Sequence, residues 1–234
     1  MRTLIIPDIH NHTENADHWL ATQAYDRVVF LGDYFDSFGD NVSDVRQTAV
    51  WLRDRMESSD DVFLLGNHDV AYMFPNEPAV ECPGFKRPKA AAIREVLQRR
   101  HWLRFELAWE EQGWLLSHAG FSPIWIPEPS PARILARCGE AMQLARRGKL
   151  DPVLGYGELP HGLQRIGGPL WMTWEAFVST PGINQIVGHS SDAEVREKNG
   201  ERSRNYCIDV GNASVAAILS DGKLEILEQT KHHV

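Results

Sequence analysis

The chain has 234 residues, of which 43% are hydrophobic and 24% are charged. A chain of this length can bury a substantial core, and its composition is that of an ordinary globular protein rather than a disordered one. The formal net charge of −8 argues against a broad basic surface that holds nucleic acid, because binding to the phosphate backbone depends on clustered lysine and arginine. We therefore expect one domain over residues 1–234, with no nucleic acid among its partners.

Short apolar runs alternate with helical patterns in the first third of the chain. The runs at 4–6, 28–31 and 62–65 are typical of buried strands. Between the last two, Asn41 and Asp44 have the spacing of a helix start. Apolar residues then recur every three or four positions on one helix face, at Val42, Val45, Ala49, Leu52 and Met56. The order of strand, helix, strand, helix and strand predicts a parallel βαβαβ unit with right-handed crossovers.

Two further helices and more strands are expected downstream. Pro88 opens one helical pattern and Ser130 with Pro131 opens another. The runs at 114–116 and 183–187 predict buried strands, and we expect a second sheet from the strand signals that follow Val187. These last signals lie at 205–210, 215–219 and 224–227, with a hairpin turn at 220–222. Residues 75–90 and 148–169 are rich in Pro and Gly, and we interpret them as loops that shape substrate access.

Metal-competent side chains follow five of the apolar runs. They are Asp8 and His10, then Asp33 and Asp36, then Asn67 and His68, then His118, and finally His189. One Gly-Asp or Gly-Asn-His motif alone is a common turn. The preference of these residues for turns does not explain, however, why metal-competent side chains follow five predicted strands. Carboxylates and imidazoles are ligands of borderline-hard divalent metals, and loops after parallel strands gather on one sheet edge. The repetition predicts a two-metal site.

The spacing of the motifs suggests how the ligands divide between two ions. Asp8 and His10 are two residues apart and share one face of an extended chain, so they would hold the first metal. Asp33 has two carboxylate oxygens and would bridge both ions. The remaining ligands, all expected on the second metal, are Asn67, His118 and His189. Open positions on such ions would hold a bridging hydroxide that attacks a phosphoester in line.

His68 follows the ligand Asn67 directly and cannot easily bind the same ion. We predict that it is the general acid that protonates the leaving group, and that Asp36 orients it and favours its charged form. The alternative interpretation of His68 is an exposed loop histidine. Four other residues near the motifs receive no role, namely His12, Asp69, His101 and His161. The tryptophans at 109, 114, 171 and 174 are expected to pack in the core or its rim.

These motifs resemble those of the calcineurin-like metallophosphoesterase superfamily and, within it, the phosphoprotein phosphatase family. That family includes serine/threonine protein phosphatases and symmetrical diadenosine tetraphosphatases. The likeness covers residues 3–70, 114–123, 168–174 and 184–219. It implies an α/β fold, a four-layer αββα sandwich of two mixed β-sheets flanked by helices. It also implies the same dinuclear site, usually occupied by manganese, iron or zinc.

The chain departs from the pattern of the phosphoprotein phosphatases at the positions of two arginines. The residue after Asp36 is Ser37, and residues 170–174 contain no arginine. In the family these arginines clamp the substrate phosphate with paired hydrogen bonds. Arg165 and Arg204 are candidates to replace them, so the substrate-binding residues remain unassigned.

Two positions bear on whether the chain resembles the phosphodiesterase branch of the superfamily. That branch usually has a further metal-binding histidine two positions after His189, where this chain has Ser191. The first metal would then keep three protein ligands, as in the phosphoprotein phosphatases. Asp69, in contrast, leans toward the phosphodiesterase pattern.

The leading hypothesis is a metal-dependent phosphatase that hydrolyses phosphomonoesters, with a phosphoprotein or a small molecule as substrate. One alternative is a nucleotide hydrolase or phosphodiesterase with the same metals, similar to diadenosine tetraphosphatase. Another is a non-catalytic binding module that the metals stabilise. The unpaired spacing of Cys82, Cys138 and Cys207 predicts no disulfide framework. Neither a signal peptide nor a membrane helix is predicted, so we expect a cytoplasmic protein without a membrane partner.

Overall fold

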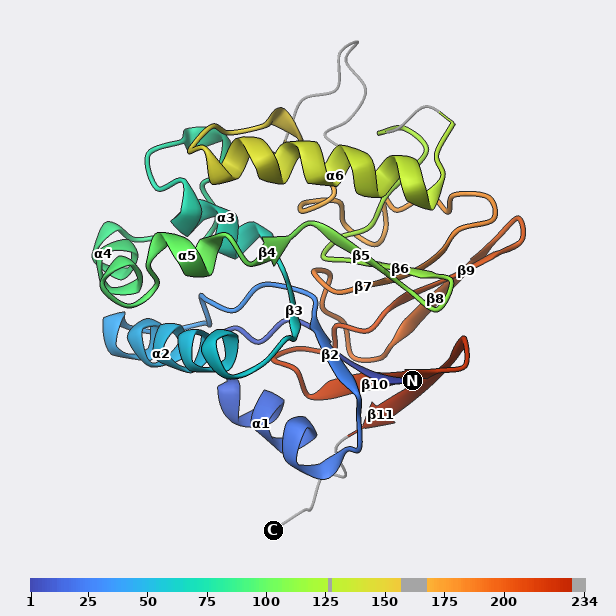
Figure 1. Ribbon diagram of the computed structural model, residues 1–234, viewed down its shortest axis with the longest axis horizontal. Coiled ribbons are helices and arrows are strands. Elements are labelled where there is room, and N and C mark those ends of the chain that lie inside the picture. Colours follow the sequence, from blue (N-terminus) through green and yellow to red (C-terminus); the bar gives the residue numbers. More distant parts are fainter. Residues whose placement is uncertain (126–127, 157–167, 229–234) are drawn as a thin grey trace.

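The computed structural model describes residues 1–125, 128–156 and 168–228 (Figure 1). Its strands form two mixed sheets. The first sheet has the order β11-β10-β1-β2-β3-β4, from Lys223–Glu228, Val215–Ser220, Arg2–Ile6, Arg27–Phe30, Val62–Leu64 and Phe105–Glu106. The second has the order β5-β6-β7-β9-β8, from Ala108–Glu111, Trp114–Ser117, Asn184–Val187, Ser203–Cys207 and Arg196–Gly200.

The helices cover the outer faces of the two sheets. The described α-helices are α1 (Thr13–Thr22), α2 (Val42–Ser58), α3 (Asn67–Met73), α4 (Arg87–Val96), α5 (Arg99–Trp102) and α6 (Pro131–Arg146), with short 3₁₀ turns at η1 (Pro78–Val80) and η2 (Pro152–Leu154). Figure 1 shows α6 on the side of β5 and β6, and α1 and α2 on the side of β2. Among the described residues, no helix combines the length and hydrophobicity needed to cross a membrane.

Alternating residues of each central strand pack on opposite sides, as the pleat requires. Ile5 and Val29 lie in a core between the sheets, against Leu116 and Ile186 of the second sheet. Their neighbours at even positions, such as Leu4, instead contact the apolar faces of the helices. This arrangement confirms the predicted four-layer αββα sandwich.

The predicted βαβαβ unit is also confirmed. Strands β1, β2 and β3 pair in parallel, with Leu4 opposite Val28 and Val29 opposite Val62. At the start of α2 the Asn41 side chain accepts a hydrogen bond from the Ser43 backbone N–H at 2.7 Å. The Asp44 carboxylate in turn accepts one from the Asn41 N–H at 2.9 Å, which completes the capping box. The predicted apolar face of α2 is buried except for Val42, which is 40% exposed in the first turn.

The expected membership of the second sheet was only partly right, because β9 belongs to it as expected but the two strands that follow do not. Strands β10 and β11 return to the first sheet, where Ile218 of β10 pairs antiparallel with Leu4. The physical reason is that Ala217 and Leu219 fill the core between the sheets while Ala216 and Ile218 face the helices, so β10 needs a position buried on both faces. The second sheet begins earlier, at β5, and includes the polar strand β8, whose sequence carries no apolar alternation.

The two expected loops are only partly loops. The first ends at Arg87, where α4 begins with Pro88 in its first turn, as the proline predicted. The helix after Ser130 is also confirmed, because the Ser130 hydroxyl accepts from the Arg133 N–H at 3.3 Å and caps α6. Of the second expected loop, residues 157–167 lie outside the described residues.

Candidate active site

The loops after the parallel strands carry the predicted site residues to one end of the sandwich. Strands β1, β2 and β3 lead to Asp8, Asp33 and Asn67, and strands β6 and β7 lead to His118 and His189. The two sheets meet here, because the His189 N–H donates to both Asp8 carboxylate oxygens at 2.9 and 3.0 Å. Residues from both sheets therefore build one site.

Several residues of these loops have strained backbone conformations. His10, Asp33, Asp36 and His189 all have positive φ, at 46°, 51°, 66° and 68°. Residues other than glycine rarely adopt this region, and strained backbone tends to persist at functional sites. Gly188 permits a close approach, since a Cβ there would lie 2.0 Å from an Asp8 oxygen.

Four potential ligand atoms converge around the ring of His118. Its Nε2 lies 2.9 Å from Asn67 Oδ1, 3.2 Å from His189 Nδ1 and 3.4 Å from Asp33 Oδ2. The opposite nitrogen, Nδ1, donates to the Leu31 carbonyl at 3.0 Å, which leaves Nε2 free as a ligand. Burial, and then the neighbouring His118, lower the pKa of His189 to about 3, so its ring is neutral. This donor set fits a divalent metal.

A second group of donors lies on the other side of Asp33. His10 Nδ1 donates to the Phe35 carbonyl at 3.0 Å and so leaves Nε2 free, 3.9 Å from Asp33 Oδ2. The same Asp33 oxygen faces His118, so Asp33 lies between the two groups, where a bridging carboxylate is required. Asp8 is fully buried, with Oδ1 3.9 Å from Nδ1 of His118. The third side chain that offers a ligand atom within 4.8 Å of those of His10 and Asp33 is His68 rather than the predicted Asp8.

Several carboxylates are buried in this region, and their negative charge favours bound cations or protons. Burial, followed by the neighbouring Asp209, raises the pKa of Asp8 well above its usual value. Burial also raises the pKa of Asp33, but His118, His68 and His10 outweigh it, and the pKa lies well below its usual range. Clustered carboxylates in a low-dielectric interior are stable only with cations or protons nearby.

Asp209 is a buried member of this cluster that the sequence interpretation missed. It is 2% exposed and follows β9, the next parallel strand after β7. Its pKa is raised, chiefly by burial. The signal that would have identified it is the one used for the other motifs, since Asp209 also follows a short apolar run that forms a strand.

Asp69, which received no role from the sequence, ties two motif loops together. Its carboxylate accepts hydrogen bonds from the backbone N–H groups of Asp33 and Gly66 at 2.8 Å and of Tyr34 at 3.0 Å. Burial and then Asp33 raise the pKa of Asp69 to about 7, although the bonds from Gly66 and Tyr34 oppose this. Asp69 therefore fixes the backbone that presents the Asp33 carboxylate.

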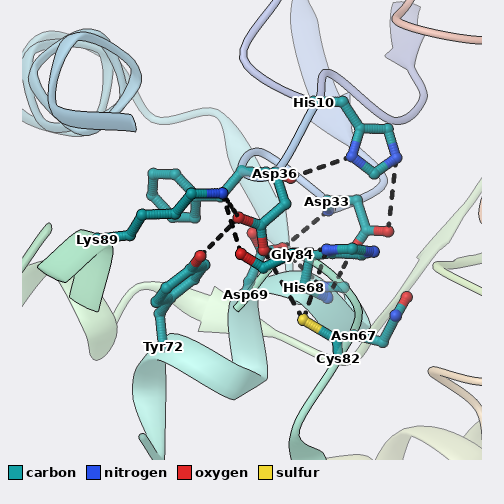
Figure 2. Close-up of polar contacts among 12 residues, drawn as sticks. His10, Asp33, Asp36, Asn67, His68, Asp69, Tyr72, Cys82, Gly84 and Lys89 are labelled. Carbon is teal, nitrogen blue, oxygen red and sulfur yellow. Dashed lines mark hydrogen bonds and ion pairs between the residues drawn. The ribbon is translucent and has the colours of Figure 1, made fainter. Parts of the chain in front are cut away.

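The predicted pair of His68 and Asp36 is in contact, with Nδ1 and Oδ2 3.1 Å apart (Figure 2). The His68 backbone N–H also donates to Asp33 Oδ1 at 2.9 Å, which places the ring beside the metal-competent group. Burial lowers the pKa of His68, but the carboxylates of Asp33 and Asp36 raise it to about 12. This shift favours the charged form of the ring, of whose side chain 16% is exposed.

Three further residues surround Asp36, and none of them was predicted to act at the site. Tyr72 OH and Lys89 Nζ donate to Asp36 Oδ1 at 2.6 and 2.8 Å (Figure 2). Lys89 is 1% exposed and also donates to Asp40 at 2.6 Å. The thiol of Cys82 lies 3.5 Å from His68 Nδ1. Nothing in the sequence distinguishes Lys89 from a surface lysine of an amphipathic helix.

Arg204, one of the two proposed replacements for the phosphate clamp, does not reach this site. It lies near the amino end of β9, whereas Asp209 follows the carboxyl end of that strand. Its guanidinium is exposed, pairs with Glu197 at 3.3 Å and covers the ring of Tyr206. The other candidate, Arg165, lies outside the described residues.

The remaining sequence expectations concern structural residues. Trp114 and Trp174 are buried, and Trp109 and Trp171 are partly buried against the core clusters, as predicted. The three cysteines, Cys82, Cys138 and Cys207, are buried and free. His101 caps α5 by accepting from the Gln98 N–H at 2.9 Å, His12 contacts Glu14, and His161 lies outside the described residues.

Comparison with known proteins agrees with this geometry. The family model described as calcineurin-like phosphoesterase matches residues 1–192. No curated protein matches the chain at a significant level.

Solved structures of phosphatases share the fold. A cold-active protein tyrosine phosphatase superimposes with a TM-score of 0.60 at 16% identity, over 97% of this chain and 78% of that one. A cold-active protein-tyrosine phosphatase of a psychrophilic Shewanella species gives 0.57 at 17% identity, over 97% and 80%. A protein serine/threonine phosphatase from Saccharomyces cerevisiae gives 0.52 at 12% identity, over 99% and 81%.

Proposed function

The chain belongs to the calcineurin-like phosphoesterase family, whose members are phosphoester hydrolases, and from this premise we propose that it is a metal-dependent phosphatase for phosphomonoesters. The observation that carries the proposal is the position of Asp33, which lies between two groups of ligand atoms and beside a cationic histidine. The proposed substrate is a phosphoprotein or a phosphorylated small molecule.

Two divalent ions fit the donor atoms. Asp8, His10 and Asp33 would hold one ion, and Asp33 would share the other with the remaining ligands, Asn67, His118 and His189. The fit rests on the free ring nitrogens that face Asp33 and on the excess of buried carboxylates. Manganese, iron and zinc all suit this donor set. When bound, such ions would polarise the phosphoryl group and activate water.

His68 would supply the proton that the leaving group needs. Because Asp36 engages Nδ1, the Nε2 proton is the one available for transfer. In this step a water oxygen forms a bond to phosphorus while the ester P–O bond breaks. The electron pair of the broken bond stays on the leaving oxygen, and the Nε2 proton moves to that oxygen. Asp36 keeps its charge, since hydrogen bonds from His68, Lys89 and Tyr72 outweigh burial and lower its pKa.

One observation favours a second candidate, a nucleotide hydrolase or phosphodiesterase with the same site. Ser37 follows Asp36 directly, and residues 168–174 contain no arginine. A phosphomonoester dianion gains more from a bidentate guanidinium than a diester monoanion does. The missing arginines would therefore narrow the difference in turnover between monoesters and diesters.

The two candidates are separated by turnover of a substrate panel with manganese added. The panel contains phosphoserine and phosphotyrosine peptides, nitrophenyl phosphate, bis-nitrophenyl phosphate and diadenosine tetraphosphate. A phosphatase should have higher kcat/KM on at least one monoester than on the other substrates. Preference for the dinucleotide or the diester would support the second candidate. Inactivity on every substrate with two metals bound would instead indicate a binding module.

A further inference from the structure

The thiol of Cys82 forms a compact triangle with the two residues of the proposed proton donor (Figure 2). Its sulfur lies 3.5 Å from His68 Nδ1 and 3.8 Å from Asp36 Oδ2, and these last two atoms are 3.1 Å apart. A thiol, an imidazole and a carboxylate are three of the side-chain types that bind zinc. None of the three atoms belongs to the proposed ligands of the dinuclear site.

The dimensions of the triangle suit one small cation. A point equally far from the three atoms lies about 2 Å from each of them. Zinc bonds to imidazole nitrogen and carboxylate oxygen are roughly 2.0–2.2 Å long, and the zinc–thiolate bond is about 2.3 Å. A slight displacement of the ion from the plane would meet all three lengths. The fourth, open position of a tetrahedral ion would take water.

The three donors come from separate segments that the fold holds in place. Asp36 follows β2, His68 lies in the first turn of α3, and Cys82 follows η1 and is 5% exposed. Lys89 and Tyr72 both engage Oδ1 of Asp36, so the other oxygen, Oδ2, is the one that faces the thiol. The three donor atoms therefore already face one another in this structure, and binding of an ion requires no backbone movement to bring them together.

We propose that Asp36, His68 and Cys82 form a third cation site, specific for zinc and similar thiophilic divalent ions, and that its occupation inhibits the hydrolase. The inhibitory part rests on the proposed role of His68 as the acid. On binding, the ion forms bonds to Oδ2, Nδ1 and Sγ, and two protons leave for solvent, one from the imidazolium Nδ1 and one from the thiol. The ion adds two positive charges and two protons are lost, so the net charge of Asp36, His68, Cys82 and the ion together is unchanged.

Inhibition follows from the atom that the ion occupies. With the ion on Nδ1, His68 no longer donates from this nitrogen to Asp36, so the contact that orients the proposed acid is lost. The ring is also fixed between Asp36 and Cys82, so it cannot follow the leaving oxygen. Zinc at this site should lower turnover and leave the affinity for substrate almost unchanged.

The first test is zinc inhibition of the manganese-loaded enzyme, with activity expressed relative to each variant without zinc. Loss of one ligand should raise the zinc concentration for half-inhibition roughly tenfold or more in Cys82→Ser and in Cys82→Ala. Cys138→Ser, which alters another buried cysteine, should behave like the wild type. Manganese content is measured in parallel, because a loss of manganese would show that zinc has instead entered the dinuclear site. Equal zinc sensitivity of all four proteins would overturn the inhibitory role.

The second test uses cobalt and does not depend on activity. Thiolate-to-cobalt charge transfer gives an absorption band in the near ultraviolet, and the proposed dinuclear ligands include no cysteine. The band should accompany a third cobalt ion in the wild type and in Cys138→Ser, and should be lost in Cys82→Ser. An inactive protein with this band would refute the proposed function and retain the site. Absence of the band from the wild type would refute the site itself.

Discussion

Replacement of Lys89 by methionine tests whether its buried ammonium is necessary for the fold around Asp36. The ammonium contacts Asp36 at 2.8 Å and Asp40 at 2.6 Å, and the side chains of both aspartates are also buried. Removal of one partner from a buried ion pair usually costs about 3–5 kcal/mol, because a charge is left without compensation. Methionine has a similar length, so lost packing contributes little.

The loss of unfolding free energy that we expect for Lys89→Met lies near the lower end of that range. Asp36 would keep its bonds from His68 and Tyr72, and Asp40 would keep a bond from the Asn11 amide at 2.8 Å. We therefore expect Lys89→Met to lower the free energy of unfolding by about 3 kcal/mol. With a urea dependence of about 3 kcal/mol/M, the unfolding midpoint should fall by about 1 M.

The assay is urea unfolding at a fixed excess of manganese, because bound metal shifts apparent stability. Lys86→Met is the matched control, since Lys86 is exposed and should change stability by less than about 0.5 kcal/mol. Asp40→Asn combined with Lys89→Met should cost less than the sum of the two single changes, because their charges interact. A loss below about 1 kcal/mol for Lys89→Met, or strict additivity, would show that the buried charge balance is not what stabilises this region.

The other predictions concern catalysis. Asp33→Asn should lower metal content as well as activity, because both proposed ions share this carboxylate, and elemental analysis that finds two metals per chain would contradict the bridging role. His68→Asn should keep both metals yet lose roughly 100-fold in turnover on an alkyl phosphate, and less on nitrophenyl phosphate, whose leaving group needs no proton. Equal losses on the two substrates would exclude His68 as the acid. Ser37→Arg should raise monoester turnover relative to diester turnover, and an unchanged ratio in a folded, metal-loaded variant would show that Ser37 does not face the phosphate.

Local chemistry was sufficient for much of the fold and for the proposed ligands. The capping box at Asn41 and the proline at Pro88 fix helix starts through contacts within a few residues, which the sequence displays directly. The repeated order of apolar run and polar residue predicted parallel strands that end at one site, because parallel strands must end on the same side. The structure brings the residues of that pattern together, including Asp8 and His189 from different sheets.

Only the tertiary structure decided which distant segments meet. Nothing local to β10 decides whether it pairs with β1 in the first sheet or joins the second sheet, since a position in either sheet would bury its apolar residues. Asp209, Lys89 and Cys82 likewise acquire their surroundings from the packing of β9, α4 and the segment after η1 against other elements. A contact such as that between Asp36 and Lys89 spans 53 positions and leaves no periodic signal. Local patterns therefore determined the elements and the ends of their strands, whereas long-range packing determined the charge balance around the proposed acid, because electrostatic interactions depend on distance in space and not along the chain.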